Sequence, residues 1–198
     1  MARRFAYFCF ALAIIFVGIA TTSAHPPPEA QSASAESAFD PANATTTPGY
    51  YSVVRVVDGD TIVVWKDGEE VTVRLIGMDT PETLDPRKPV ECFGPEASAE
   101  GKRILSHEDV RLVPDHSQDV YDRYGRMLAY VYMPSGLLYN EFMIAEGYAH
   151  EYTYKKAYQF QKEFKAAQAQ AKAAHKGFWS PDTCNGDTGI YSTPSKIR

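Results

Sequence analysis

From Tyr50 onward the chain is rich in strand-forming residues, and within residues 69–76 apolar and polar residues alternate with the two-residue period of a half-buried β-strand. Asp67-Gly68 is typical of a two-residue hairpin turn, so the strands on either side of it are expected to be antiparallel. The first three predicted strands span residues 50–57, 61–66 and 69–76. In the third strand the apolar residues share one face, which places Arg74 on the opposite face.

Helices and two further strands follow a long polar loop at residues 77–94. The helices are predicted over residues 96–105, 137–146 and 155–174, and the strands over residues 110–113 and 128–133. Pro95 suits a first helical turn, whereas Gly147 and Gly177 suit helix ends. Five short strands with interposed helices predict an α+β fold built on a small barrel, and an OB-fold barrel is one such solution.

The N-terminal part of the chain differs from the rest. Two arginines, an apolar run from Phe5 to Ala20 and small residues up to Ala24 have the layout of a secretory signal peptide. The apolar run is shorter than the ~20 residues of a membrane-spanning helix, although retention as an N-terminal anchor stays open. We expect a signal peptide at 1–24, a disordered linker at 25–48, a folded domain at 49–182 and a C-terminal tail at 183–198.

Of the three cysteines, Cys9 lies in the predicted signal peptide. The remaining pair, Cys92 and Cys184, is expected to form one disulfide, because an even number of cysteines in an exported protein favours pairing. Two free thiols or a reactive cysteine are the alternatives.

Carboxylates gather in the loops next to the predicted hairpin. Asp58 and Asp60 flank Gly59 before the second strand, and Asp79 and Glu82 follow the third strand. Because these two strands are antiparallel, Asp60 is expected to lie near Asp79. Carboxylates that converge in this way suit a hard cation such as Ca²⁺. Ordinary turn chemistry explains the same residues, so both interpretations stay open at this point.

Two arginines extend this pattern. Arg74 precedes Asp79 on the same strand, and Arg126 lies at the start of another predicted strand. A cation, guanidinium groups and a carboxylate are the groups that phosphodiester hydrolysis requires. Surface ion pairing is the alternative role of the arginines. The net charge of −5 argues mildly against nucleic-acid binding, so affinity would have to come from a local basic rim.

Five motifs stand in order between Val53 and Trp179. They read VVDGDT from Val56, RLI from Arg74, DTPET from Asp79, GPEAS from Gly94 and DRYGRMLAY from Asp122. In this order and spacing they resemble the staphylococcal nuclease family. The resemblance implies a five-stranded OB-fold barrel with three α-helices. It also implies Ca²⁺-dependent cleavage of DNA and RNA to products with 3′-phosphate ends.

The resemblance assigns roles to single residues. The implied metal ligands are Asp60, Asp79 and the backbone carbonyl of Thr80, with Asp58 behind them. The implied catalytic residues are Arg74, Glu82 and Arg126. The implied substrate contacts are Lys88, Arg123, Tyr124, Tyr152 and Tyr154. The spacing around the last two tyrosines departs from the family by about one residue, so which of them stacks on a base stays open, as does simple packing. The cysteine pair is not part of the family pattern.

A non-catalytic OB-fold module that binds nucleic acid or protein is the alternative function. Such a domain is expected to lose its acidic and arginine positions, whereas this chain keeps all of them. An envelope-anchored structural protein would require the N-terminal segment to be retained. The sequence therefore favours a secreted, monomeric phosphodiester hydrolase with DNA and RNA as substrates and no obligate protein partner.

Overall fold

The computed structural model describes residues 48–83 and 89–189, all of which belong to one compact unit. The predicted signal peptide, the predicted linker up to its last residue, and Lys88 lie outside the described residues. Among the residues that are described, no helix is both long and apolar enough to cross a membrane.

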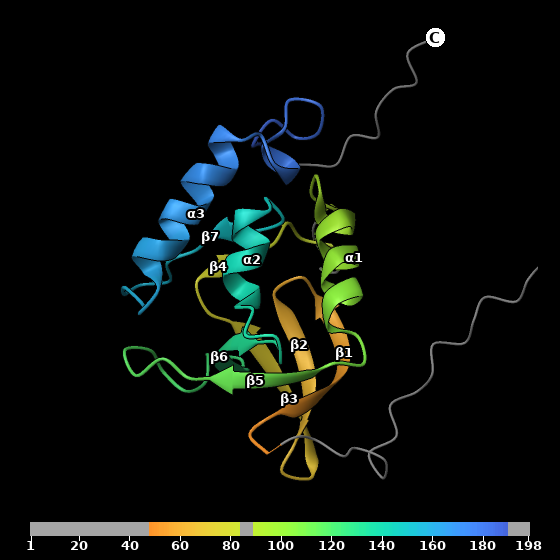
Figure 1. The fold of residues 1–198 in the computed structure, drawn as a ribbon, viewed down its shortest axis with the longest axis vertical. Coiled ribbons are helices and arrows are strands. Elements are labelled where there is room, and N and C mark those ends of the chain that lie inside the picture. Colours follow the sequence, from red (N-terminus) through yellow and green to blue (C-terminus); the bar gives the residue numbers. More distant parts are fainter. Residues whose placement is uncertain (1–47, 84–88, 190–198) are drawn as a thin grey trace, which may run out of the picture. The chain divides into compact units, whose positions relative to one another are not determined.

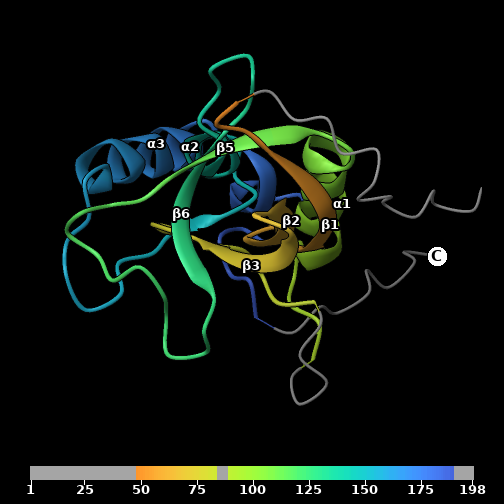
Figure 2. The ribbon, with the colours of Figure 1, turned by 90° about the horizontal axis from the view of Figure 1, so that it is seen from below.

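Five strands close into a barrel in the order β1-β2-β3-β6-β5 (Figures 1 and 2). They are β1 (Tyr51–Asp58), β2 (Thr61–Lys66), β3 (Glu69–Leu75), β5 (Asp109–Val113) and β6 (Met127–Tyr132). All neighbouring pairs are antiparallel except β3 and β6, which are parallel. The barrel confirms the predicted OB-fold architecture with its α+β character.

The β2–β3 hairpin sets the register that matters for the site. Asp67 and Gly68 both have positive φ, at 53° and 91°, as a tight primed hairpin turn requires. The resulting register pairs Thr61 with Arg74, and the backbone N–H of Leu75 donates to the carbonyl of Asp60. The start of β2 therefore lies beside the end of β3, as the sequence predicts.

Three α-helices accompany the barrel: α1 (Gly94–Leu105), α2 (Tyr139–Ala145) and α3 (Gln161–Ala173). The short 3₁₀ helix η2 (Gly177–Trp179) follows. Helix α1 packs on β1, and α2 packs on α3 and β6 (Figure 1). The largest fully buried side chains join the barrel interior to the helices, and they include Ile62, Leu75, Met78, Leu105, Tyr130, Tyr139, Met143, Ile144, Phe164 and Phe178.

The start and the end of α3 differ from the prediction. The helix begins at Gln161 rather than at residue 155, because Lys155 adopts a left-handed φ of 61° that a helix cannot contain. His175, with φ 52°, provides the left-handed residue after the helix. Gly177, predicted to end the helix, instead lies against Gly147, where an added Cβ would come within 2.1 Å of the Gly147 carbonyl oxygen.

Two very short strands were not predicted. Met78–Asp79 (β4) lies inside the segment expected to be a loop, and it pairs with His150–Glu151 (β7) in an antiparallel two-stranded sheet. Two residues are too few to show an alternating pattern in sequence. The pairing matters, because it fixes the backbone of Asp79 against the segment that leads to Tyr152.

Buried Asp115 anchors the loop between β5 and β6. Its Oδ2 accepts hydrogen bonds from the Tyr130 hydroxyl at 2.7 Å and the Gln159 N–H at 2.7 Å, and its Oδ1 accepts from the Ser117 N–H at 2.8 Å. Burial alone would raise the pKa of Asp115, but these hydrogen bonds outweigh it and hold the pKa below its ordinary value.

We expect Asp115→Asn to destabilise the protein at neutral pH by about 1–3 kcal/mol, because the amide cannot accept the same charged hydrogen bonds. The depressed pKa of Asp115 means that its stabilisation is present above the pKa of the unfolded chain and is lost as pH falls through the folded pKa. The difference in unfolding free energy between variant and wild type should therefore shrink as the pH falls below about 4. Thermal unfolding across this range measures it, and a constant difference at all pH values would contradict it.

Candidate active site

Arg74 bridges two acidic residues from different elements. Its Nη1 lies 2.9 Å from Asp60 Oδ2, and its Nη2 lies 2.5 Å from Asp79 Oδ1. Nη1 also donates to the Met78 carbonyl at 3.0 Å. Asp60 comes from the turn before β2, Arg74 from β3 and Asp79 from β4. The hairpin register therefore brings together the two carboxylates that the sequence places near each other.

Two carboxyl groups of the site, Asp58 and Asp79, have raised pKa values. Burial and the neighbouring Asp60 charge, with a smaller contribution from Glu82, raise the pKa of Asp58 to about 7. Burial, partly offset by Arg74, raises the pKa of Asp79 to about 6, with the Asp60 charge adding to the increase. Burial therefore disfavours the ionised forms of both carboxyl groups, the neighbouring carboxylates add to this effect, and a bound cation would offset it.

The oxygen atoms gathered here are of the kinds that bind a hard divalent cation. Carboxylate and carbonyl oxygens are the ligands that Ca²⁺ takes in proteins, and Asp60, Asp79 and the Thr80 backbone provide both kinds. The Thr80 N–H donates to Asp60 Oδ2 at 3.0 Å, so these residues adjoin. Within the described ranges, no three Asp, Glu, His or Cys side chains form a ready-made metal cluster. Arg74 lies between the two aspartates and makes the contacts that a cation would make.

Glu82 lies on the chain segment that follows Thr80. Its Oε1 accepts a hydrogen bond from the Thr83 N–H at 3.0 Å, and its charge contributes to the raised pKa of Asp58. The Glu82 N–H donates to Glu91 Oε2 at 3.0 Å. The backbone of the predicted catalytic carboxylate is thus fixed by Glu91, a residue that the sequence did not single out.

Arg126 is oriented by a turn that begins at Asp122. Asp122 Oδ1 accepts the backbone N–H groups of Tyr124 and Arg126, both at 2.9 Å, while Oδ2 accepts the Arg126 Nε at 2.7 Å. Burial alone would raise the pKa of Asp122, but these hydrogen bonds hold it below its ordinary value. The Arg126 guanidinium also lies 5.4 Å from the Tyr124 ring centroid. Asp122 therefore holds Arg126 in one orientation.

Arg74 and Arg126 both line one cavity of about 840 Å³. Arg74, Asp79 and Arg126 line it together with the predicted substrate contacts Arg123, Tyr124, Tyr152 and Tyr154. Tyr124 is 68% exposed, and the rings of Tyr152 and Tyr154 stack with centroids 6.3 Å apart. These three tyrosines thus present aromatic surface to the cavity rather than filling the core.

Comparisons with known proteins identify relatives of this chain. The family model described as "Staphylococcal nuclease homologue" matches residues 72–181, more than half of the chain. The chain belongs to the staphylococcal nuclease family. It is 45% identical over 130 residues to the thermonuclease of Staphylococcus hyicus, which covers 66% of this chain and 75% of the relative. It is 39% identical over 129 residues to the thermonuclease of Staphylococcus intermedius, which covers 65% and 75%, respectively.

A more distant relative is the endonuclease YncB of Bacillus subtilis, 36% identical over 127 residues, which covers 64% of this chain and 59% of the relative. Thermonuclease and endonuclease relatives confirm the enzyme interpretation: the protein is a nuclease that hydrolyses phosphodiester bonds in nucleic acid. The alternative of a non-catalytic OB-fold module is therefore wrong.

The residues of this nuclease that sequence reasoning missed are of two kinds. Asp122 and Glu91 hold the catalytic candidates through hydrogen bonds, and such partners depend on loop geometry that a sequence pattern does not encode. Tyr121, Lys155 and Lys156 line the cavity beside the predicted contacts. Tyr121 is 56% exposed. It directly precedes the DRYGR motif, and this position was the one sequence signal that it belongs to the site.

Proposed function

We propose that the protein is an exported, Ca²⁺-dependent nuclease that acts on DNA and RNA and leaves 3′-phosphate ends. One observation carries the proposal: Arg74 joins Asp60 to Asp79 at the wall of a cavity that Arg126 shares, in a chain related to thermonucleases. Export follows from the signal-peptide layout of residues 1–24 and agrees with a disulfide between Cys92 and Cys184.

Asp60, Asp79 and the Thr80 carbonyl would hold the cation, with Asp58 supporting them from behind. Bound there, Ca²⁺ would neutralise charge on the phosphate and polarise it for attack. The raised pKa values of Asp58 and Asp79 support this role, because burial and, to a smaller degree, the neighbouring carboxylates disfavour their ionised forms, and a bound cation would offset this cost. The Arg74 guanidinium, which lines the cavity, would bind a phosphate oxygen through its planar fork.

Glu82 would orient the attacking water or take its proton. Attack on phosphorus would break the bond to the 5′ oxygen, so the phosphate would stay on the 3′ oxygen of the preceding nucleotide. Arg126 would meet the negative charge that develops on the phosphate and on the departing oxygen. The exposed tyrosines of the cavity would contact the nucleotide by stacking, which suits single-stranded substrate of any sequence.

Protein secreted from an expression host tests the proposal. Its mature N-terminus, measured by mass spectrometry, should be His25. In Ca²⁺ the protein should cleave single-stranded DNA and RNA oligonucleotides, and a chelator in excess over Ca²⁺ should stop cleavage. Mass spectrometry of the fragments should find phosphate on the 3′ ends.

Each part of the proposal has its own contrary result. Equal cleavage in Ca²⁺ and in chelator would sink the metal requirement, and 5′-phosphate fragments would sink the assigned bond. A retained N-terminal segment would indicate an anchored protein. Circular dichroism of the same sample controls for folding, so that lost activity is not confused with lost structure.

A further inference from the structure

The backbone around Glu82 is held by a short segment that precedes helix α1. The Glu82 N–H donates to Glu91 Oε2 at 3.0 Å, and the Glu91 N–H donates back to the Glu82 carbonyl at 2.9 Å. The two residues therefore form a reciprocal pair. Any displacement of Glu91 would be passed directly to the backbone of Glu82.

The start of helix α1 packs against the same Glu82 segment. Its first residue, Gly94, lies so near the Glu82 segment that an added Cβ would come within 3.0 Å of the Glu82 carbonyl oxygen and 3.1 Å of the Pro81 carbonyl oxygen. Glu91 and Gly94 thus contact the Glu82 segment from two positions three residues apart. Cys92 lies between them.

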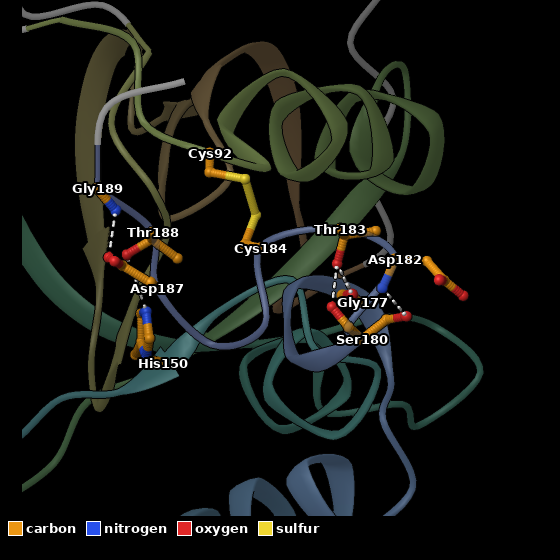
Figure 3. Close-up of a disulfide and its surroundings, with 10 residues drawn as sticks. All are labelled: Cys92, His150, Gly177, Ser180, Asp182, Thr183, Cys184, Asp187, Thr188 and Gly189. Carbon is orange, nitrogen blue, oxygen red and sulfur yellow. Dashed lines mark hydrogen bonds between the residues drawn. A yellow bond between two sulfur atoms is a disulfide. The ribbon is translucent and has the colours of Figure 1, made fainter. Parts of the chain in front are cut away.

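Cys92 links residues 91–94, which hold the Glu82 backbone, to the C-terminal segment around Cys184. It forms a disulfide with Cys184 (Figure 3), with the Cα atoms 6.0 Å apart and a sequence separation of 92. The Cys92 N–H also donates to the Gly189 carbonyl at 3.0 Å. The residue after Cys92, Phe93, has a left-handed φ of 69°, which is unfavourable for a side chain with a Cβ. Such a conformation persists only where its surroundings enforce it.

We propose that the Cys92–Cys184 disulfide positions Glu82 for catalysis, so that full nuclease activity requires oxidation of this cysteine pair. The inference rests on the role of Glu82 in the proposed function. Oxidation removes two electrons and two protons from the thiols by exchange with a disulfide oxidant, and a dithiol reductant returns them. A nuclease of this design has low activity in a reducing cytosol and gains activity in an oxidising compartment.

The same geometry separates this role from general stabilisation. Among the described residues no hydrogen bond joins Asp60 or Asp79 to Cys92 or Glu91, whereas Glu82 exchanges two hydrogen bonds with Glu91. Asp79 senses Glu91 only through its charge, which adds to the raised pKa of Asp79. Loss of the disulfide should therefore lower kcat by a larger factor than it changes the Ca²⁺ dissociation constant. A merely structural bond would alter neither quantity in protein that is still folded.

The experiment compares the oxidised wild type with a Cys92→Ser, Cys184→Ser double variant, each with and without a dithiol reductant. Cleavage of a DNA oligonucleotide in Ca²⁺ is followed well below the unfolding midpoint of the double variant, and Ca²⁺ binding is titrated separately. The double variant and the reduced wild type should both lose about tenfold in kcat, since small displacements of a reacting group are costly. The reductant should leave the double variant unchanged, and amide exchange at Glu82 should become faster in it.

Glu91→Ala should lower kcat in the same way, and Glu91→Gln, which keeps an acceptor oxygen, should restore most of it. A folded double variant with kcat within about twofold of the wild type would overturn the inference. Full activity of Glu82→Gln would overturn the role of Glu82 and the inference with it. Absence of Ca²⁺-dependent cleavage by the oxidised wild type would instead refute the proposed function itself, so the two failures are distinguishable.

Discussion

Arg126→Ala should lower kcat on single-stranded DNA by roughly 10²–10³ while the protein stays folded. Arg126 lines the cavity with Arg74, and its Nη2 and Nε both lie 2.7 Å from Asp122 Oδ2, so its guanidinium is fixed before substrate arrives. A donor that needs no rearrangement stabilises developing charge more than a mobile one does. The turn itself should survive, because Asp122 Oδ1 binds the backbone N–H of residue 126 and not its side chain.

The matched controls are a charge-conserving variant and a distant arginine. Arg126→Lys keeps the positive charge but loses the planar fork, so it should recover little of the lost rate. Arg103→Ala removes an arginine on α1 that is 67% exposed and paired with Glu100, so its kcat should stay that of the wild type. Steady-state kinetics with circular dichroism on each variant measure this. An Arg126→Ala variant with ordinary turnover would rule out the assigned role.

The barrel was predictable from sequence because its signals are local. Strand-forming residues in β2, alternation in β3 and the Asp67-Gly68 turn define the β2–β3 hairpin. The hairpin alone implies that Asp60 lies near the end of β3. The start of α3 was not predictable in this way. Residues near Lys155 have helical composition, but the left-handed Lys155 and the packing of Tyr158 and Phe160 against the core override local preference.

The sequence predicted that Asp60 and Asp79 lie close together, but not the contacts that their side chains make. The acidic loops and the two arginines were found from the motifs, and the structure brings Asp60, Arg74 and Asp79 together. That Arg74 bridges the two aspartates depends on side-chain geometry across three elements. The reciprocal pairing of Glu82 with Glu91 depends in the same way on loop geometry, and no sequence period encodes it.

In the Ca²⁺-free protein, Arg74→Ala should lower the free energy of unfolding by about 3 kcal/mol or more, in addition to its effect on cleavage. The Arg74 and Asp60 side chains are only 14% and 10% exposed, so the substitution leaves a buried carboxylate without its cation. The Asp79 side chain is half-exposed, so loss of its contact with Arg74 should cost less free energy. For a domain of this size the loss corresponds to a fall of about 10 °C in Tm.

Calcium and a second substitution distinguish this cause from simple loss of packing. If the uncompensated charge of Asp60 is responsible, Asp60→Asn in the Arg74→Ala background should recover part of the lost stability, and Ca²⁺ should raise the Tm of the single variant more than that of the wild type. Arg55→Ala is the control, because Arg55 pairs with Glu70 on the barrel surface at 56% and 46% exposure and should cost less than about 1 kcal/mol. Equal losses for Arg74→Ala and Arg55→Ala would show that Arg74 does not act as the resident cation of the acidic site.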